Sequence, residues 1–212
     1  MKLKNIKHAL KHGLFLQEFK KWLGRHVDFR FIPYYLMEER AFPGEPSVKD
    51  PQGYEVRILK GGTELQDIVR QNPSVYTASW KERFEKSHLC VALLKSGRLA
   101  AYCWADPEEF NFSPRSLSLE AGDAYLYDAF TIDAFRGQGL APYMRKQCYR
   151  ILNEQGYDRF YSVSDLSNSS TIKFKKKLHA RILRLRLKID FRGKELCNLA
   201  IRNYAGRNKG QP

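Results

Sequence analysis

The sequence predicts an α/β protein of 212 residues, in which one globular domain follows an N-terminal helical extension. Two observations support this prediction. From residue 54 onward, segments with the alternation or apolar runs of strands take turns with segments of helical periodicity. Hydrophobic residues make up 43% of the chain and aromatic residues 13%, which is typical of a globular protein and not of a disordered chain.

The first 50 residues are predicted to be a helical extension followed by a linker. In residues 1–26 the apolar positions fall on two helical faces that change over at Gly13, which favours two short helices. Their polar faces are basic, a pattern compatible with a membrane surface, whereas docking on the protein's own core or on a second subunit is the favoured interpretation. Residues 41–55 contain three prolines and two glycines and are predicted to be the linker.

Residues 51–204 are predicted to form the globular domain, and residues 205–212 a flexible tail. The expected elements, in order, are a strand at 54–60, helices at 62–73 and 74–87, a hairpin at 88–106 that turns at Ser96-Gly97, a strand at 123–132, a helix that ends at Gly156, a strand at 158–165, a helix at 167–180, and strands at 182–190 and 195–201.

The net charge of +14 is concentrated near the C-terminus. Residues 170–212 contain 13 Lys and Arg against 2 Asp and Glu, whereas residues 51–169 contain 14 against 15. Such a basic block attracts phosphates, nucleic acid or an anionic membrane, or it forms a solvated face. Without a groove-reading motif, nucleic acid is not the expected partner. A homodimer and peripheral contact with an anionic membrane stay open as partner hypotheses.

The location expected from the sequence is cytoplasmic, with peripheral contact at the inner membrane face left open. No apolar run approaches the roughly 20 residues that cross a bilayer, and the basic N-terminus is a poor secretory signal. The four cysteines, Cys90, Cys103, Cys148 and Cys197, lie far apart and lack the spacing of metal ligands. They are therefore expected to be free thiols in a protein without a metal.

The stretch FTIDAFRGQGLAPYM, residues 130–144, places an arginine and a Gly-x-Gly pair between a strand and a helix. Amides at a helix N-terminus lack intrahelical partners and lie at the positive end of the helix dipole. Glycines leave those amides open to a phosphate. On spacing alone a plain tight turn is the favoured explanation, and the third glycine of a dinucleotide fingerprint is missing.

The segment FRGQGLA resembles the Arg/Gln-x-x-Gly-x-Gly/Ala signature of the GNAT acyltransferase superfamily. A second segment, which begins at Asn168, is similar to that family's later helix, and the order of elements over the last three quarters of the chain agrees with it. The resemblance implies a mixed, mostly antiparallel sheet flanked by helices. It also implies transfer of an acyl group, most simply acetyl, from acetyl-CoA or another acyl-CoA to a primary amine by direct attack in a ternary complex.

The resemblance also assigns the residues that would bind CoA. The signature loop would bind the pyrophosphate, the backbone of the central strand would pair with the pantetheine arm where it splays from the strand at 158–165, and the asparagine would bind the pantetheine or the adjoining backbone. These positions are Ala129, Phe130, Thr131, Arg136, Gly137, Gln138, Gly139, Leu140, Ala141 and Asn168.

The catalytic positions depart from the family pattern. The tyrosine that serves as the acid in the family corresponds to Lys175, and two positions that carry the base correspond to Val163 and Tyr125. Asp128, a carboxylate in an apolar strand, is the preferred base, and a structural hydrogen bond is the alternative.

Tyr125 is the second predicted catalytic residue, as an acid, with packing in the strand as the alternative. Further candidates are Asp123 and Asp165 as bases, Tyr127 and Tyr143 as acids or packing residues, and His179 as a surface or capping residue. Lys175 is expected to bind CoA phosphates or to belong to a solvated face. The acceptor stays open among small amines, amino sugars and protein amino groups. The alternative function is a non-catalytic module that binds acyl-CoA or an anionic surface.

Overall fold

The computed structural model describes residues 28–41, 51–71, 79–113 and 117–204. These residues belong to two compact units. The larger unit spans Leu36–Ile182, and the smaller unit combines residues before 36 with residues after 182. The predicted helices at 1–26, most of the predicted linker and the predicted tail lie outside the described residues.

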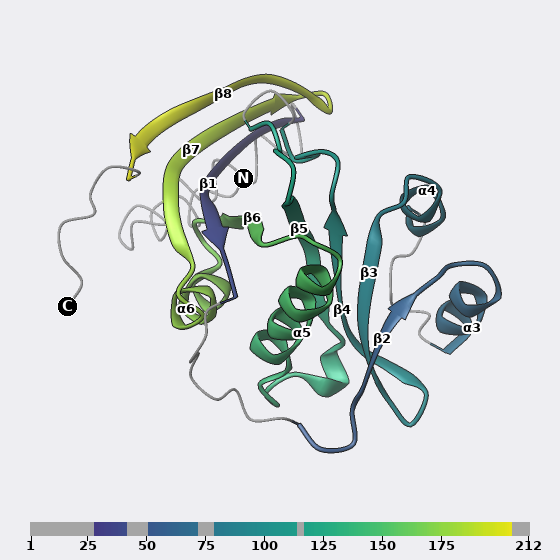
Figure 1. The fold of residues 1–212 in the computed structure, drawn as a ribbon. Helices are drawn as coiled ribbons and strands as arrows, with labels where there is room; N and C mark the ends of the chain where they lie inside the picture. The colour runs from purple at the N-terminus through teal and green to yellow at the C-terminus, as the bar shows by residue number, and fades with distance from the viewer. Residues whose placement is uncertain (1–27, 42–50, 72–78, 114–116, 205–212) are drawn as a thin grey trace, which may run out of the picture. The chain divides into compact units, whose positions relative to one another are not determined.

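The larger unit contains a sheet in the order β2 (Glu55–Leu59), β3 (Leu89–Lys95), β4 (Arg98–Asp106), β5 (Asp123–Thr131) and β6 (Arg159–Asp165) (Figure 1). The first three pairings are antiparallel, and β5 pairs with β6 in parallel. The helices are α3 (Thr63–Gln71), α4 (Trp80–Glu85), α5 (Leu140–Glu154) and α6 (Ser169–Lys177), and a 3₁₀ turn, η2, covers Asp133–Phe135. This arrangement confirms the predicted fold class, a mixed and mostly antiparallel sheet flanked by helices.

The two faces of this sheet have separate cores. On one face, Ala124 and Leu126 of β5 pack with Met144 and Cys148 of α5. On the other face, Trp80 of α4 and Ile68 of α3 pack in a cluster with β3 and β4 residues such as Trp104. Side chains of a strand alternate between the faces, so neighbouring residues of β4 and β5 serve different cores.

The smaller unit contains residues of β1 (Phe29–Glu39), β7 (Arg181–Phe191) and β8 (Lys194–Asn203), and β1 and β7 continue into the larger unit. β7 and β8 form an antiparallel hairpin. Arg186 of β7 is 8% exposed because its guanidinium donates to the carbonyl and side-chain oxygens of Asn198 on β8, at 2.7 and 2.8 Å. One arginine of the alternating basic pattern is therefore buried.

One described element differs from the prediction. No helix or strand is predicted for residues 27–40, yet Phe29–Glu39 form strand β1. Within the helix predicted at 74–87, Trp80–Glu85 are helical, and the predicted start at Ser74 lies outside the described residues. The β3–β4 turn at Ser96-Gly97 is confirmed, and both residues have the positive φ angles that a two-residue hairpin turn requires.

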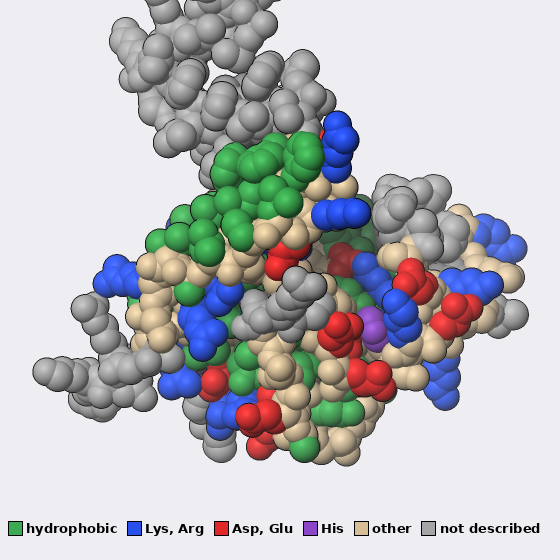
Figure 2. Space-filling model, turned by 90° about the horizontal axis from the view of Figure 1, so that it is seen from above, with side chains coloured by type: hydrophobic (Ala, Val, Ile, Leu, Met, Phe, Trp, Pro, Cys, Tyr) green, Lys and Arg blue, Asp and Glu red, His purple; other side chains and the backbone are tan. Residues whose placement is uncertain are grey.

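On the face shown in Figure 2, hydrophobic side chains gather in an area with basic side chains beside it. Three large hydrophobic residues of β8, Leu196, Leu199 and Ile201, are each more than half exposed. Among the described residues, no helix is long and apolar enough to cross a membrane.

Candidate functional site

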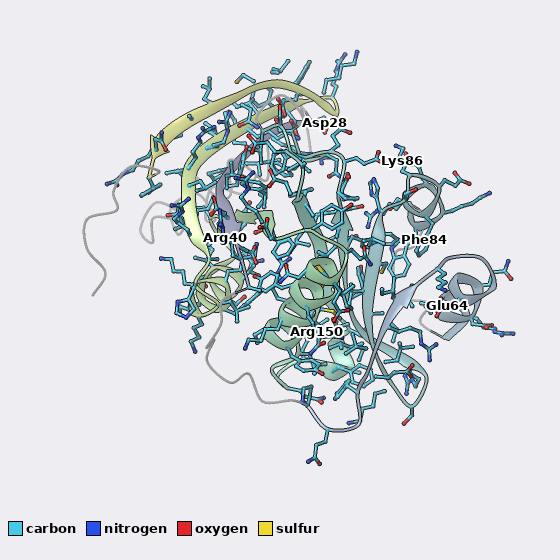
Figure 3. The ribbon with its side chains drawn as sticks, viewed as in Figure 1. Asp28, Arg40, Glu64, Phe84, Lys86 and Arg150 are labelled. Carbon is cyan, nitrogen blue, oxygen red and sulfur yellow. The ribbon has the colours of Figure 1, made fainter. Side chains whose placement is uncertain are left out.

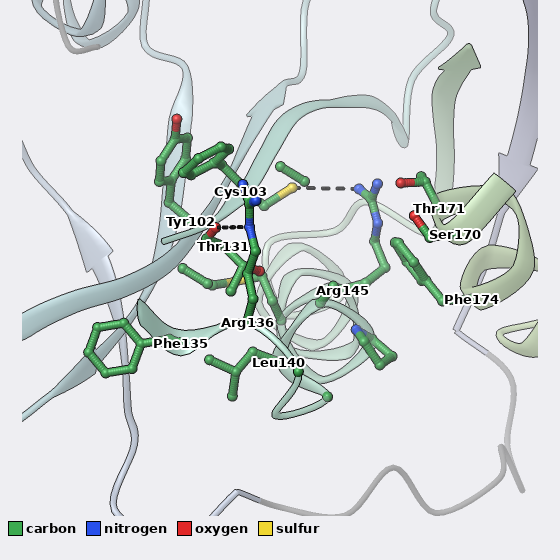
Figure 4. Close-up of a pocket in the computed structure, with 18 of the residues that line it drawn as sticks. Tyr102, Cys103, Thr131, Phe135, Arg136, Leu140, Arg145, Ser170, Thr171 and Phe174 are labelled. Atoms are coloured by element: carbon green, nitrogen blue, oxygen red, sulfur yellow. Dashed lines mark hydrogen bonds between the residues drawn. The ribbon is translucent and has the colours of Figure 1, made fainter. Parts of the chain in front are cut away.

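A cavity of about 390 Å³, here called the first cavity, lies between β4, β5, α5 and α6. Figure 4 shows the Arg145 guanidinium lying between Cys103 of β4 and Ser170 and Thr171 of α6. Of the ten residues predicted to bind the cofactor, the first cavity is lined by Ala129, Phe130, Thr131, Arg136, Gly137, Gly139, Leu140, Ala141 and Asn168. The structure thus brings nine of them together. The exception is Gln138, whose side chain accepts a hydrogen bond from the Tyr54 hydroxyl at 2.6 Å.

The glycine loop leads into the N-terminus of α5. Gly137 and Gly139 have φ angles of 79° and 72°, in the left-handed region that favours glycine. A Cβ at either position would meet no atom within 4 Å, so backbone conformation and not lack of space requires glycine. Gly139 is the N-cap and supplies no side-chain acceptor to the first amides of α5. These amides and the positive end of the helix dipole suit a phosphate group.

Two side chains hold the rim of the first cavity in place. Arg136 donates from Nε to the Thr131 carbonyl at 3.3 Å and pairs with Asp133 at 2.8 Å, which ties the loop to the end of β5. Asn168 is the N-cap of α6, and its Oδ1 accepts hydrogen bonds from the Thr171 amide and the Ser170 hydroxyl. Both residues therefore fix the backbone around the first cavity.

Strand β5 leaves β6 halfway along its length. Its register with β6 covers only Asp123–Leu126, whereas its register with β4 continues to Thr131. The same region contains a β-bulge, in which Asp128 and Ala129 lie opposite the single residue Cys103. The edge of β5 that lines the first cavity consequently offers backbone donors and acceptors to an extended ligand.

Of the two predicted catalytic residues, Asp128 lies in this bulge and Tyr125 lies before it on β5. Asp128 has a φ of 45°, its side chain is 36% exposed, and its carboxylate pairs with Arg83 of α4 at 2.5 Å. Tyr125 is 3% exposed, stacks on Tyr127 and packs edge-on against Phe110. Neither residue lines the first cavity.

A second cavity of about 240 Å³ opens on the α4 side of the sheet. Its lining residues are Ser79, Glu82, Arg83, Lys86, His88, Asp106, Glu109, Asn111 and Tyr127. Within it, His88 Nδ1 lies 2.6 Å from the Tyr127 hydroxyl and Nε2 lies 3.2 Å from Asp106 Oδ2. His88, Asp106 and Arg83 were not predicted as site residues from the sequence. His88 and Asp106 are the two ends of the predicted hairpin, so pairing of its strands would have brought them close together.

Comparison with known proteins gives the family. Residues 63–180 match the sequence profile described as "Acetyltransferase (GNAT) family". This match covers more than half of the chain and lies within the larger unit. The chain belongs to the GNAT family. No curated protein matches the chain.

Solved GNAT structures have the same fold at low sequence identity. A GCN5-related N-acetyltransferase from Sphaerobacter thermophilus is 14% identical, with a TM-score of 0.53 over 88% of this chain and 57% of that chain. A GNAT-family acetyltransferase from Novosphingobium aromaticivorans is 21% identical, with a TM-score of 0.50 over 74% and 64%. One from Kribbella flavida is 14% identical, with a TM-score of 0.51 over 81% and 63%. The chain thus spans about 57–64% of the length of these proteins.

The GNAT tyrosine position is occupied by a lysine that the sequence analysis placed wrongly. Lys175 is 1% exposed, so it belongs to no solvated face, and it does not line the first cavity. Its Nζ donates to the Ser162 and Ser164 hydroxyls and the Val163 carbonyl and lies 3.7 Å from Glu39. Burial lowers the pKa of Lys175 to about 8, against the attraction of Glu39. Lys175 is buried because of its position on the helix: it lies on the same inward side as Leu178, three residues later.

Glu39 is the centre of a buried ion cluster behind the first cavity. Its carboxylate pairs with Arg145 Nε at 3.3 Å and accepts hydrogen bonds from Ser162 and Tyr149. Burial alone raises the pKa of Glu39, but Arg145, Lys175 and these hydrogen bonds lower it below its ordinary value. Arg145 also donates from Nη1 to the Cys103 sulfur at 3.5 Å, so the cluster reaches the cavity wall.

Proposed function

We propose that this GNAT protein is a CoA-dependent N-acyltransferase that transfers an acetyl group from acetyl-CoA to a primary amine by direct attack in a ternary complex. The observation that supports it is the first cavity, which combines an uncapped helix N-terminus with the free edge of a strand. The helix end suits the pyrophosphate, and the strand edge suits the amides of the pantetheine arm. CoA carries these two groups in sequence, the pyrophosphate first and then the amides of the pantetheine arm.

The bulge gives the acyl group a defined position. Pantetheine that pairs with β5 from Thr131 toward Ala129 would bring its thioester to the point where the strand is distorted. Backbone amides near a bulge lack strand partners and can donate to the thioester oxygen as negative charge develops on it. Asp128 and Tyr125 stay predictions as catalytic groups, and Asp128→Asn and Tyr125→Phe test them.

The second candidate function is a non-catalytic acyl-CoA-binding module. The observation that favours it is Lys175, a buried lysine committed to Glu39 and two serines at the position of the family's acid. An acyltransferase therefore needs another source of protons, whereas a binding module needs none.

Two measurements separate these functions. Calorimetric titration with CoA and acetyl-CoA tests the first cavity, and release of free thiol tests turnover over a panel of small amines, amino sugars and peptides. We expect binding of both ligands and faster thiol release with at least one amine. Binding without amine-stimulated release would support the binding module, and absence of binding would contradict both functions.

A further inference from the structure

In the second cavity the side chains of Tyr127, His88 and Asp106 lie in a row. The Tyr127 hydroxyl and His88 Nδ1 are hydrogen-bonded at 2.6 Å, and His88 Nε2 lies 3.2 Å from Asp106 Oδ2 in an ion-pair contact. A carboxylate has no proton to donate, so the tautomer with its proton on Nε2 fits beside Asp106, and in that tautomer Nδ1 accepts from the tyrosine hydroxyl. This row of groups suits proton transfer from the tyrosine to the histidine.

Asp106 is built as an anion at the inner end of this row. Its side chain is 2% exposed, and its Oδ1 accepts hydrogen bonds from the Glu108 and Glu109 amides at 3.0 and 2.9 Å. Asn111 donates to Oδ2 at 2.9 Å. A carboxylate that is held in this way stabilises a positive charge on the adjacent imidazole. His88 is consequently equipped to take a proton from Tyr127.

The two cavities are lined by neighbouring residues of β5. Tyr127 lines the second cavity and Ala129, two residues later, lines the first. The backbone between them spans about 7 Å at most. Pairing with β6 has ended at Leu126, so β6 does not pair with β5 along this stretch. An amine in the second cavity would approach an acyl group in the first across this unpaired stretch.

We propose that Tyr127, His88 and Asp106 form the proton relay for acyl transfer and that the second cavity receives the acceptor amine. This proposal rests on the proposed N-acyltransferase function. Tyr127 is the catalytic residue that contacts the amine, and His88 and Asp106 act through it. Burial raises the pKa of Tyr127, so its hydroxyl stays neutral and gives up its proton only as it receives the proton of the amine.

The charges around the relay suit an amine. Glu82 is paired with Lys86, and Arg83 is paired with Asp128 while lying 5.0 Å above the Tyr127 ring. Glu109 lines the same cavity and attracts Lys86 across it, and among the described residues its carboxylate makes no closer ion pair or hydrogen bond. The Glu109 carboxylate is thus placed to accept a hydrogen bond from an amine.

The reaction balances in atoms and electrons. The lone pair of the neutral amine forms the C–N bond, the C–S bond breaks, and its electron pair leaves on the CoA sulfur. The amine proton passes to the Tyr127 oxygen while the Tyr127 proton passes to His88 Nδ1, and Asp106 stabilises the imidazolium. Return of that proton to the CoA sulfur gives the free thiol and replaces the missing tyrosine acid.

The test compares His88→Asn with His179→Asn. His179 is exposed at the end of α6 with a φ of 57°, a conformation that asparagine tolerates, so it is a matched control. We expect His88→Asn and Tyr127→Phe to lower kcat/KM by on the order of 10²–10³-fold, with CoA affinity unchanged and the double variant no worse than either single one. Added imidazole should restore part of the activity of His88→Asn, which a purely structural defect would not allow.

The pH profile provides a second measurement. The pH dependence of kcat/KM should differ between wild type and His88→Asn, because this variant lacks the imidazole, and it should be the same in wild type and His179→Asn. The charged or titratable groups that face His88 are Tyr127, Asp106, Arg83, Lys86, Glu82 and Glu109. None of them is removed by either histidine variant, so a change in the profile reports His88.

Two outcomes would overturn the relay and leave N-acyl transfer intact. They are wild-type activity in a folded His88→Asn variant and a pH profile that this substitution leaves unchanged. Binding of acetyl-CoA by wild type without transfer to any amine would instead reject the proposed function, and the relay with it. Failure of wild type to bind CoA would reject both as well.

Discussion

The first cavity is built mainly from backbone groups, whereas the second is built from side chains that meet across three elements. The first uses the glycine loop, the N-terminus of α5 and the free edge of β5. The second needs His88, Asp106 and Tyr127, which lie on separate segments of the chain. Backbone sites tolerate changes of side chain, so one fold can keep its donor site while the opposite site adapts to another acceptor.

The largest expected effect is on stability, and it concerns the buried ion cluster around Glu39 behind the first cavity. Glu39→Gln removes the anion that holds Arg145 and Lys175, and it leaves two buried cations without their counter-charge. We expect a loss of about 3–5 kcal/mol in the free energy of unfolding, measured by urea denaturation. The control is the exposed ion pair on α5 between Glu154 and Arg150, and Figure 3 labels Arg150. Glu154→Gln should cost less than about 1 kcal/mol, and equal losses would contradict the assigned role of Glu39.

The glycine loop gives the next largest effect. Gly139→Val places a β-branched residue at a φ of 72° and should distort the loop at a cost of about 1–3 kcal/mol. CoA affinity should therefore fall by roughly 10–100-fold in calorimetric titrations. Gln138→Ala changes a side chain that bonds to Tyr54 and does not line the first cavity, and it should leave affinity within about twofold. The reverse order would mean that side chains, not backbone, bind the ligand.

The ion pair above the second cavity should have a smaller effect on catalysis than the relay. Arg83 lies above Tyr127 and is held by Asp128, so Asp128→Asn keeps the turn conformation while weakening the position of Arg83. We expect kcat/KM to fall by about tenfold. A loss as large as that of His88→Asn would instead identify Asp128 as the base, as the sequence predicts.

Lys175 predicts a modest dependence of stability on pH. Its folded pKa of about 8 lies below the ordinary value of 10.5, so the unfolded chain binds this proton more tightly. Between about pH 8 and 9.5, wild type should therefore gain stability relative to Lys175→Met as the pH rises, by at most about 1 kcal/mol per pH unit. The free energy of unfolding of both proteins is measured by urea denaturation at each pH. A difference between the two proteins that does not change with pH would contradict the assignment.

The sequence predicted most of the fold because local patterns encode it. The β3–β4 turn, the strand–loop–helix around Gly139 and the end of α5 depend on neighbours along the chain. Strand β1 was missed because its aromatic run lacks clean alternation and its environment comes from distant strands. Nine of the predicted cofactor residues line one cavity. They belong to two short contiguous segments and one helix cap, so a local sequence pattern was enough to recognise them.

The side-chain sites could not be predicted in the same way. His88, Asp106 and Tyr127 come together only through the register of β3, β4 and β5, and Glu39 joins Lys175 across more than 130 residues of sequence. Lys175 itself could have been found, because the helical spacing of Lys175 and Leu178 contradicts a fully solvated face. Specific pairs of this kind require the packed structure.

Cys103 gives the protein an internal probe of ligand occupancy. It is the cysteine that lines the first cavity, while Cys90, Cys148 and Cys197 lie elsewhere. A hydrogen bond with Cys148 lowers the pKa of the Cys103 thiol, burial opposes this, and Arg145 adds to the lowering. A small alkylating reagent that enters the empty cavity should therefore modify Cys103, and bound CoA should protect it. Mass spectrometry of that single peptide would then report occupancy of the donor site without any knowledge of the acceptor.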